Sequence, residues 1–277
     1  MDNSKALYVY GIVFRLSHPT PLLAMGGEEK GEGGGVRFFP YQDIAALVSE
    51  VDLEEFGESS MAQNLKNLEW VKEKVMAHEK ILEKVMASQT VIPLKFGAIF
   101  TSEDRLQKVL ADSYEGFQYL LETLKDHSEC AVKLYGDLDG LREIVARTSD
   151  RIQEVAKEMK EELPGVAYLL KKKFETVLRE ETDIEKARRL REIFNRLSAH
   201  SSDDKLGDLI PHELTGKDKP MIFNGIFLIV KSKMHEFTEE VANLKREVAD
   251  LGWQVEQVGP FPPYNFSELP RVEEVPK

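Results

Sequence analysis

The order of apolar and polar positions predicts a series of strands in the first third of the chain. The first strand is expected over 6–16 (ALYVYGIVFRL), which is apolar almost throughout and rich in β-branched and aromatic side chains, as in a strand with most of its surface covered. Two further strands, at 36–39 and 44–51, are close enough to form a hairpin. Another is predicted over 91–100, where Pro93 must lie at an edge, an end or a bulge because proline has no amide hydrogen to donate.

Helical periodicity predicts two helices around the last of these strands. Ser60 and Gln63 form a capping box for one long helix, expected over 60–86 with one buried face. The apolar positions of that face are Met61, Leu65, Leu68, Val71, Val75, His78, Leu82 and Val85. Thr101 caps a second helix, expected to end near Lys125.

The second half of the chain predicts a separate α+β unit. Its expected elements are a strand at 129–136, a helical region at 139–197 broken at Pro164 and Gly165, a polar loop at 198–220, a strand at 221–230, a helix at 232–251 and a strand at 253–258. Strands with helices on one side predict a ferredoxin-like sandwich, here with an added helical hairpin. We therefore expect two domains, an N-terminal α+β domain at 1–127 and a C-terminal ferredoxin-like domain at 128–277.

Charge and composition narrow the class of protein. The chain has 277 residues, 42% of them hydrophobic, and 49 acidic against 37 basic side chains give a net charge of −12. A surface this negative repels phosphate and anionic lipid, and no basic patch offsets it, so we expect neither nucleic acid nor membrane as a partner. The single Cys130 and the lack of a signal-peptide pattern at the N-terminus favour a reducing, cytoplasmic location.

No catalytic, cofactor or metal motif in the sequence is well formed. The glycine-rich stretch at 26–35 carries three glutamates and lacks the Gly-Lys-Ser/Thr ending of a phosphate cradle, so it is expected to be a flexible loop. His78 precedes a glutamate but has no second histidine four residues on, and we interpret it as structural. Metal-ligand types also occur, in a spacing that matches no defined site, at His200, Asp203, Asp204, Asp208 and His212. We expect no catalytic residue, no cofactor and no metal.

The C-terminal segment GPFPPYNF, residues 259–266, is the one candidate for a contact with a partner. Its prolines favour polyproline II, and its aromatic side chains supply apolar area for docking. The candidate contact residues are Phe261, Pro262, Pro263, Tyr264 and Phe266. We expect the segment to pack back over its own sheet, with recognition by a partner as the alternative.

Four stretches distributed from residue 7 to residue 266, namely LYVYGIV, VIPLKFGAIF, GVAYLLKKKF and GPFPPYNF, resemble the GvpF/GvpL family of gas vesicle proteins. GPFPPYNF after a β-α-β unit is the most specific of them. The resemblance implies a two-domain, non-enzymatic accessory or minor structural protein of the gas vesicle. It also implies that the protein acts with the hydrophobic major shell protein and with other gas vesicle proteins. The glycine-rich insertion at 26–35 departs from the family pattern.

A physical hypothesis follows from this resemblance. A shell protein apolar enough to exclude water aggregates when free, and a soluble acidic partner that covers its apolar face keeps it dispersed until assembly. Two other functions stay open. Ferredoxin-like sandwiches host many activities, so an enzyme or ligand-binding module is one, and a generic scaffold that binds through the charged helical hairpin is the other.

Overall fold

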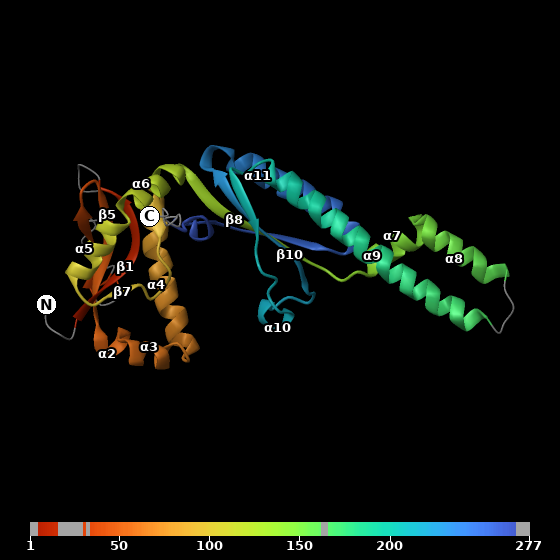
Figure 1. The fold of residues 1–277 in the computed structure, drawn as a ribbon, viewed down its shortest axis with the longest axis horizontal. Helices are drawn as coiled ribbons and strands as arrows, with labels where there is room; N and C mark the ends of the chain where they lie inside the picture. Colours follow the sequence, from red (N-terminus) through yellow and green to blue (C-terminus); the bar gives the residue numbers. More distant parts are fainter. Residues whose placement is uncertain (1–4, 16–29, 32–33, 162–165, 270–277) are drawn as a thin grey trace, which may run out of the picture. The chain divides into compact units, whose positions relative to one another are not determined.

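The computed structural model describes residues 5–15, 30–31, 34–161 and 166–269. The chain divides into two compact units, one formed by Met1–Glu129 with Pro260–Lys277 and the other by Cys130–Gly259 (Figure 1). The boundary after Glu129 lies close to the boundary expected from the sequence. The assignment of the C-terminal tail differs, because we expected residues from Pro260 onward in the C-terminal domain and they belong to the first unit.

The first unit is built on an antiparallel sheet with β1 at its centre. The strands are β1 (Lys5–Phe14), β4 (Arg37–Tyr41), β5 (Ile44–Asp52), β6 (Val91–Pro93) and β7 (Ile99–Phe100), in the order β4-β5-β1-β6, with β7 also pairing with β1. Side chains along β1 are buried on both faces, as the sequence predicted. The expected single strand at 91–100 is instead two short strands, and Pro93 ends the first of them.

Helices cover both faces of this sheet, with α4 on one side and α5 on the other (Figure 1). The helices are α2 (Leu53–Phe56), α3 (Glu58–Asn64), α4 (Leu68–Met86), α5 (Glu103–Asp112) and α6 (Tyr114–Thr123). The prediction of one helix over 60–86 was wrong, because the side chain of Asn67 accepts the amides of Glu69 and Trp70 and begins a new helix there. Leu65 and Leu68 are 53% and 82% exposed at this break, not buried.

Two further expectations about the first unit need correction. The helix predicted from Thr101 to Lys125 is divided into α5 and α6, and Ser102 is its N-cap, with Oγ accepting the amide of Arg105 at 3.3 Å. The glycine-rich stretch contains a small ladder in which β2 (Lys30–Gly31) pairs with β3 (Gly34–Gly35). The other residues of that stretch lie outside the described ones.

The second unit is a ferredoxin-like sandwich, as predicted. Its elements are β8 (His127–Tyr135), α7 (Asp139–Thr148), α8 (Asp150–Glu161), α9 (Ala167–Ser198), β9 (Asp203–Leu206), α10 (His212–Thr215), β10 (Met221–Val230), α11 (Met234–Glu247) and β11 (Gln254–Phe261). Single 3-10 turns lie at Lys231–Lys233, Ala249–Leu251 and Tyr264–Phe266. The sheet order β11-β8-β10-β9 is that of a β-α-β-β-α-β sandwich (Figure 1). Helices α9 and α11 pack on β10 as its two helices, and α7 and α8, which pack on α9, are added.

Strand β9 is an element of the second unit that no sequence pattern predicted. It lies in the stretch expected to be a polar loop, and it pairs antiparallel with β10 from Asp203 opposite Leu228 to Leu206 opposite Gly225. Its four residues include two aspartates and a lysine, so apolar alternation gave no signal. The break expected at Pro164 and Gly165 lies outside the described residues.

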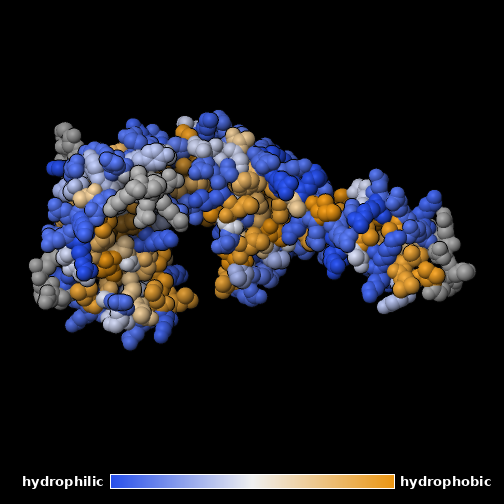
Figure 2. Space-filling model, in the orientation of Figure 1, coloured by the Kyte–Doolittle hydropathy of each residue, from blue (hydrophilic) through white to orange (hydrophobic). Residues whose placement is uncertain are grey.

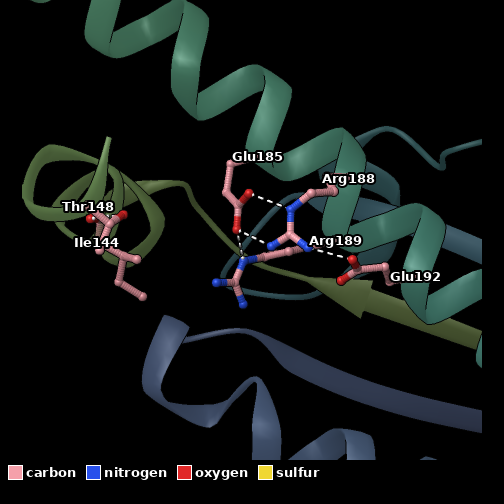
Figure 3. A network of polar contacts seen from close by, with 6 residues as sticks. All are labelled: Ile144, Thr148, Glu185, Arg188, Arg189 and Glu192. Atoms are coloured by element: carbon pink, nitrogen blue, oxygen red, sulfur yellow. Dashed lines mark hydrogen bonds and ion pairs between the residues drawn. The ribbon is translucent and has the colours of Figure 1, made fainter. Parts of the chain in front are cut away.

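Part of the charge on the long helix α9 is held in ion pairs within the helix. Glu185 accepts from Arg188 and from Arg189 at 2.7 Å, and Arg188 also reaches Glu192 at 2.5 Å (Figure 3). The nearby α7 ends with the Thr148 hydroxyl donating to the carbonyl of Ile144 at 2.9 Å (Figure 3). These are exposed helical pairs, each worth a few tenths of a kcal/mol, so this face is a solvated surface, as the sequence predicted.

The centre of the first sheet yields a test of packing. Strand β1 shifts register between Val9 and Gly11, and a Cβ on Gly11 would lie 2.6 Å from the carbonyl oxygen of Ile92. We expect Gly11→Ala to lower the free energy of unfolding by about 1–3 kcal/mol, because backbone must move to accept the methyl group. Urea unfolding followed by circular dichroism measures it. Gly35→Ala is the control, since nothing lies within 4 Å of its Cβ, and equal midpoints for both variants would contradict the argument.

Candidate functional site

The C-terminal tail bends sharply after β11 and does not continue as polyproline II. Pro263 has φ −79° and ψ 63°, an inverse γ-turn that the amide of Tyr264 closes by donating to the carbonyl of Pro262 at 2.8 Å. A 3-10 turn follows, in which the amide of Phe266 donates to the carbonyl of Pro263 at 3.1 Å. The expected polyproline II conformation is therefore wrong at Pro263, because the short turn satisfies backbone groups that an extended segment leaves to solvent.

Two carboxylates hold this tail on the first unit. The hydroxyl of Tyr264 donates to Glu79 on α4 at 2.6 Å. Both oxygens of Glu129 accept from Asn265, one from its backbone amide at 2.8 Å and one from its side-chain amide at 2.6 Å. Glu129 is only 5% exposed, and a buried carboxylate needs such donors. The tail is thus held by α4 and by Glu129 at the start of β8, and it belongs to the first unit.

The candidate contact residues of the tail are largely occupied by this packing. Pro262 and Pro263 are buried, and Phe261, Tyr264 and Phe266 are half-buried. Burial raises the pKa of Glu79, partly offset by the hydrogen bond from Tyr264, and burial together with that hydrogen bond raises the pKa of the Tyr264 phenol. The tail thus offers only parts of its apolar side chains to a partner.

His78 is a fully buried histidine with both ring nitrogens satisfied. Its Nε2 lies 3.1 Å from the carbonyl oxygen of Leu94, which can only accept, so Nε2 carries the proton. Its Nδ1 accepts from the Tyr8 hydroxyl at 2.9 Å, and that hydroxyl accepts the amide of Gly97 at 3.2 Å. Burial lowers the pKa of His78 to about 4. The ring is therefore neutral, and it fixes the segment between β6 and β7 beneath β1.

The metal-ligand types noted in the sequence do not gather into a site. Asp203 and Asp204 lie on β9, and Nε2 of His212, at the start of α10, lies 2.8 Å from the carbonyl oxygen of Lys217. Within the ranges that the structure describes, no group of three or more histidine, cysteine or acidic side chains is placed to hold a metal ion. Cys130 is buried in β8, with Sγ 3.6 Å from the sulfur of Met234.

A groove of about 490 Å³ opens on the second unit between α9 and the start of β10. Its apolar walls are Leu190 and Phe194 from α9, Ile222 and Phe223 from β10, and Leu206 at the end of β9. In Figure 2, apolar residues gather on this unit between α9 and α10. No sequence pattern predicted this surface. The available signal was the isolated leucines in the polar stretch at 198–220.

Two polar side chains line the same groove, Arg191 from α9 and Asn224 from β10. The side-chain nitrogen of Asn224 donates to the carbonyl of Asp208 at 2.9 Å, while its Oδ1 is buried and has no hydrogen-bond partner among the described residues. A groove with apolar walls and a few polar groups is the usual architecture of a binding site.

A model of the family described as gas vesicle synthesis protein GvpL/GvpF matches residues 6–268. The chain belongs to the GvpL/GvpF family. It is a gas vesicle associated protein, and the resemblance seen in its sequence motifs is confirmed. Of the helices in the described part of this family member, none is both long enough and apolar enough to cross a membrane.

Curated relatives are similar to this GvpL/GvpF family member over most of its length, and two solved structures share its fold. Gas vesicle protein L of Streptomyces sp. (strain CB03234) is 22% identical over 97% of this chain and 95% of its own length. Gas vesicle protein F1 of Halobacterium salinarum is 23% identical over 95% of this chain and 93% of its own. The crystal structure of GvpF from Anabaena sp. PCC7120 superposes with a TM-score of 0.72 at 18% identity, covering 96% of this chain and 100% of that one. GvpF from Microcystis aeruginosa gives 0.65, also at 18%, covering 95% and 99%. The two-domain α+β fold is confirmed.

The buried histidine predicts a pH dependence of stability. Because the pKa of His78 falls to about 4 on folding from its usual 6.5, the unfolded chain takes up a proton first as the pH drops, and stability is lost between those values. The loss reaches at most about 1.4 kcal/mol per pH unit. We expect His78→Asn to be less stable at pH 7 but to lose less stability between pH 6.5 and 4.5 in urea titrations.

The exposed His235, whose side chain is 83% accessible, supplies the matched control. We expect His235→Asn to follow the wild-type pH profile. Glu79 also makes stability depend on pH, in the opposite direction. Its contribution to stability is present at low pH and is lost as the pH rises through its raised pKa. Because Glu79 is unchanged in every variant, this contribution cancels when the variants are compared. Parallel profiles for wild type and His78→Asn would contradict the assignment of a neutral buried ring.

The hydrogen bonds between Asn265 and Glu129, which we call the tail clamp, predict the effect of a single isosteric change. Asn265→Asp places a second carboxylate against Glu129, so we expect the tail to detach, because two like charges then share a buried site. Hydrogen exchange of residues 260–269 should become much faster, and the melting temperature should fall. Asn195→Asp, at an exposed position of α9, makes the same charge change and should leave both unchanged. Unaltered exchange in Asn265→Asp would refute the clamp.

Proposed function

We propose that this protein binds the hydrophobic major shell protein of the gas vesicle and keeps it from aggregating until assembly. Family membership supports a role at the gas vesicle. The observation that carries the finer proposal is the apolar surface of the second unit, where Leu206, Leu209 and Leu214 are 66%, 53% and 76% exposed. Exposed apolar patches of this kind mark sites of protein interaction.

The charge of the chain supports the same proposal. A complex between an apolar client and a protein of net charge −12 keeps a strongly charged exterior, which opposes association between complexes. The paired charges along α9 keep that helix hydrated, and because they neutralise one another they do not attract anionic surfaces. The client therefore loses its exposed apolar surface while the complex stays dispersed.

The place and partners of this action are part of the proposal. We place the protein in the cytoplasm, supported by its single, buried cysteine, and include other gas vesicle proteins among its partners. Phe261, Pro262, Pro263, Tyr264 and Phe266 form the second candidate contact surface. They rank behind the leucines because the first unit already covers much of their area.

A light-scattering assay tests the proposal. Shell protein diluted from denaturant should aggregate more slowly when wild-type protein is present in equal amount. We expect a variant with Leu206→Ser, Leu209→Ser and Leu214→Ser to be at least about tenfold less effective, since each exposed leucine contributes on the order of 1 kcal/mol when covered.

Leu65→Ser with Leu68→Ser is the matched control, because these leucines are 53% and 82% exposed on the first unit. This variant should protect the shell protein as well as wild type does. If wild type gives no protection, the proposed function is wrong. If wild type protects and the triple variant protects equally, the contact lies elsewhere, and the tail is the next surface to change.

A further inference from the structure

The groove on the second unit combines an apolar lining with an unpaired cation. Arg188, Arg189 and Arg196 of α9 all form ion pairs, the last with Glu240 and Glu247. Arg191 lines the groove, and no residue in the described part of the chain makes a hydrogen bond or ion pair with its side chain. In an acidic chain whose neighbouring arginines are all neutralised, this cation is available to a partner.

The geometry of α9 separates the two roles of its charges. Positions 187, 190, 191 and 194 follow the three- and four-residue steps of one helical face, and all four line the groove. Glu185, Arg188 and Glu192 follow the same steps on another face, where they pair with one another (Figure 3). Arg191 therefore belongs to the apolar face, outside the ion-pair network.

Asn224 adds a second polar feature to the groove wall. Its buried Oδ1 can accept one more hydrogen bond than the described chain provides. Its position is tightly set, because a Cβ on Gly207 would lie 2.6 Å from its side-chain nitrogen. A ligand that fills the groove therefore lies against apolar walls and meets a cation at Arg191.

The neighbouring edge of the sheet disfavours an added strand as the ligand. On the edge strand β9, the amide of Asp204 already donates to the side chain of Asp203 at 2.8 Å. Acidic side chains on an edge strand also oppose pairing with another strand. A ligand is thus held through its side chains in the groove, as in recognition of an amphipathic helix.

We propose that the groove binds an amphipathic helical segment of the major shell protein, and that Arg191 pairs with a carboxylate that this segment carries beside its apolar side chains. This inference rests on the proposed function. Charge complementarity is the argument for the occupant, because an apolar face alone would leave Arg191 facing an uncharged partner.

A charge reversal tests this pairing. Shell protein immobilised from mild detergent is the probe, and binding of the full-length protein is measured on a biosensor. We expect Arg191→Glu to weaken binding about tenfold or more, Arg191→Lys to weaken it less, and the loss to shrink at high salt. Lys172→Glu, an exposed position of α9 away from the groove, makes the same charge change and should bind like wild type.

Reciprocal variants of the shell protein decide the result. Among single changes of its aspartates and glutamates to lysine, one should restore binding of Arg191→Glu while weakening binding of wild type. If wild type binds but Arg191→Glu binds equally well, or no reciprocal change rescues it, the pairing is overturned and the proposed function stands. If wild type itself does not bind, the proposed function fails, and this inference fails with it.

Discussion

The first unit depends on burying two tyrosine hydroxyls beneath its central strand. Tyr8 and Tyr10 are both inaccessible to solvent, so each phenol needs a partner inside the protein. Tyr10 lies 3.0 Å from the hydroxyl of Ser49 on β5, and Tyr8 donates to His78. Each of these contacts joins β1 to an element far away in sequence. The hydroxyls therefore specify which strand and which helix pack around β1, while the apolar area supplies the stabilisation.

The chain around His78 follows from the same requirement. With Nδ1 occupied by Tyr8, the ring must donate its remaining hydrogen, and the carbonyl of Leu94 accepts it. The carbonyl of Leu94 is then directed at His78, and the amide of Gly97 donates to the Tyr8 hydroxyl. Because these two backbone groups bond to side chains, Leu94 and Gly97 do not both continue a regular strand. The stretch that looks like one strand in the sequence is consequently divided into β6 and β7. Tyr264 of the tail packs against this same core.

The sequence allowed the fold to be predicted wherever burial leaves a periodic pattern. Strands β1 and β10 are apolar over nearly their whole length, and the sandwich around β10 was found from them. The errors occur where one side chain overrides the pattern. Asn67 caps a new helix inside an apolar stripe, and the inverse γ-turn at Pro263 bends a segment whose composition favours extension. Neither contact has a periodic signature.

The candidate binding surface was hidden for a related reason. Strand β9 is polar, and its strand conformation comes from pairing with β10 and not from its own residues. Its pairing places Leu206 beside the groove, next to side chains that come from α9 and β10. No local window of sequence contains all of these elements.

A single helix thus carries both properties that the proposed binding of an apolar shell protein needs. The face of α9 that includes Glu185 and Arg188 pairs its own charges, so it stays hydrated and gains little from contact with other proteins. The face that includes Leu190, Arg191 and Phe194 offers apolar area with one cation that nothing else on the helix neutralises. Apolar area alone binds any apolar surface. A cation within that area disfavours a partner that leaves the cation without a counter-charge. In the proposed complex, selectivity for one partner then depends on where the helix places a single arginine.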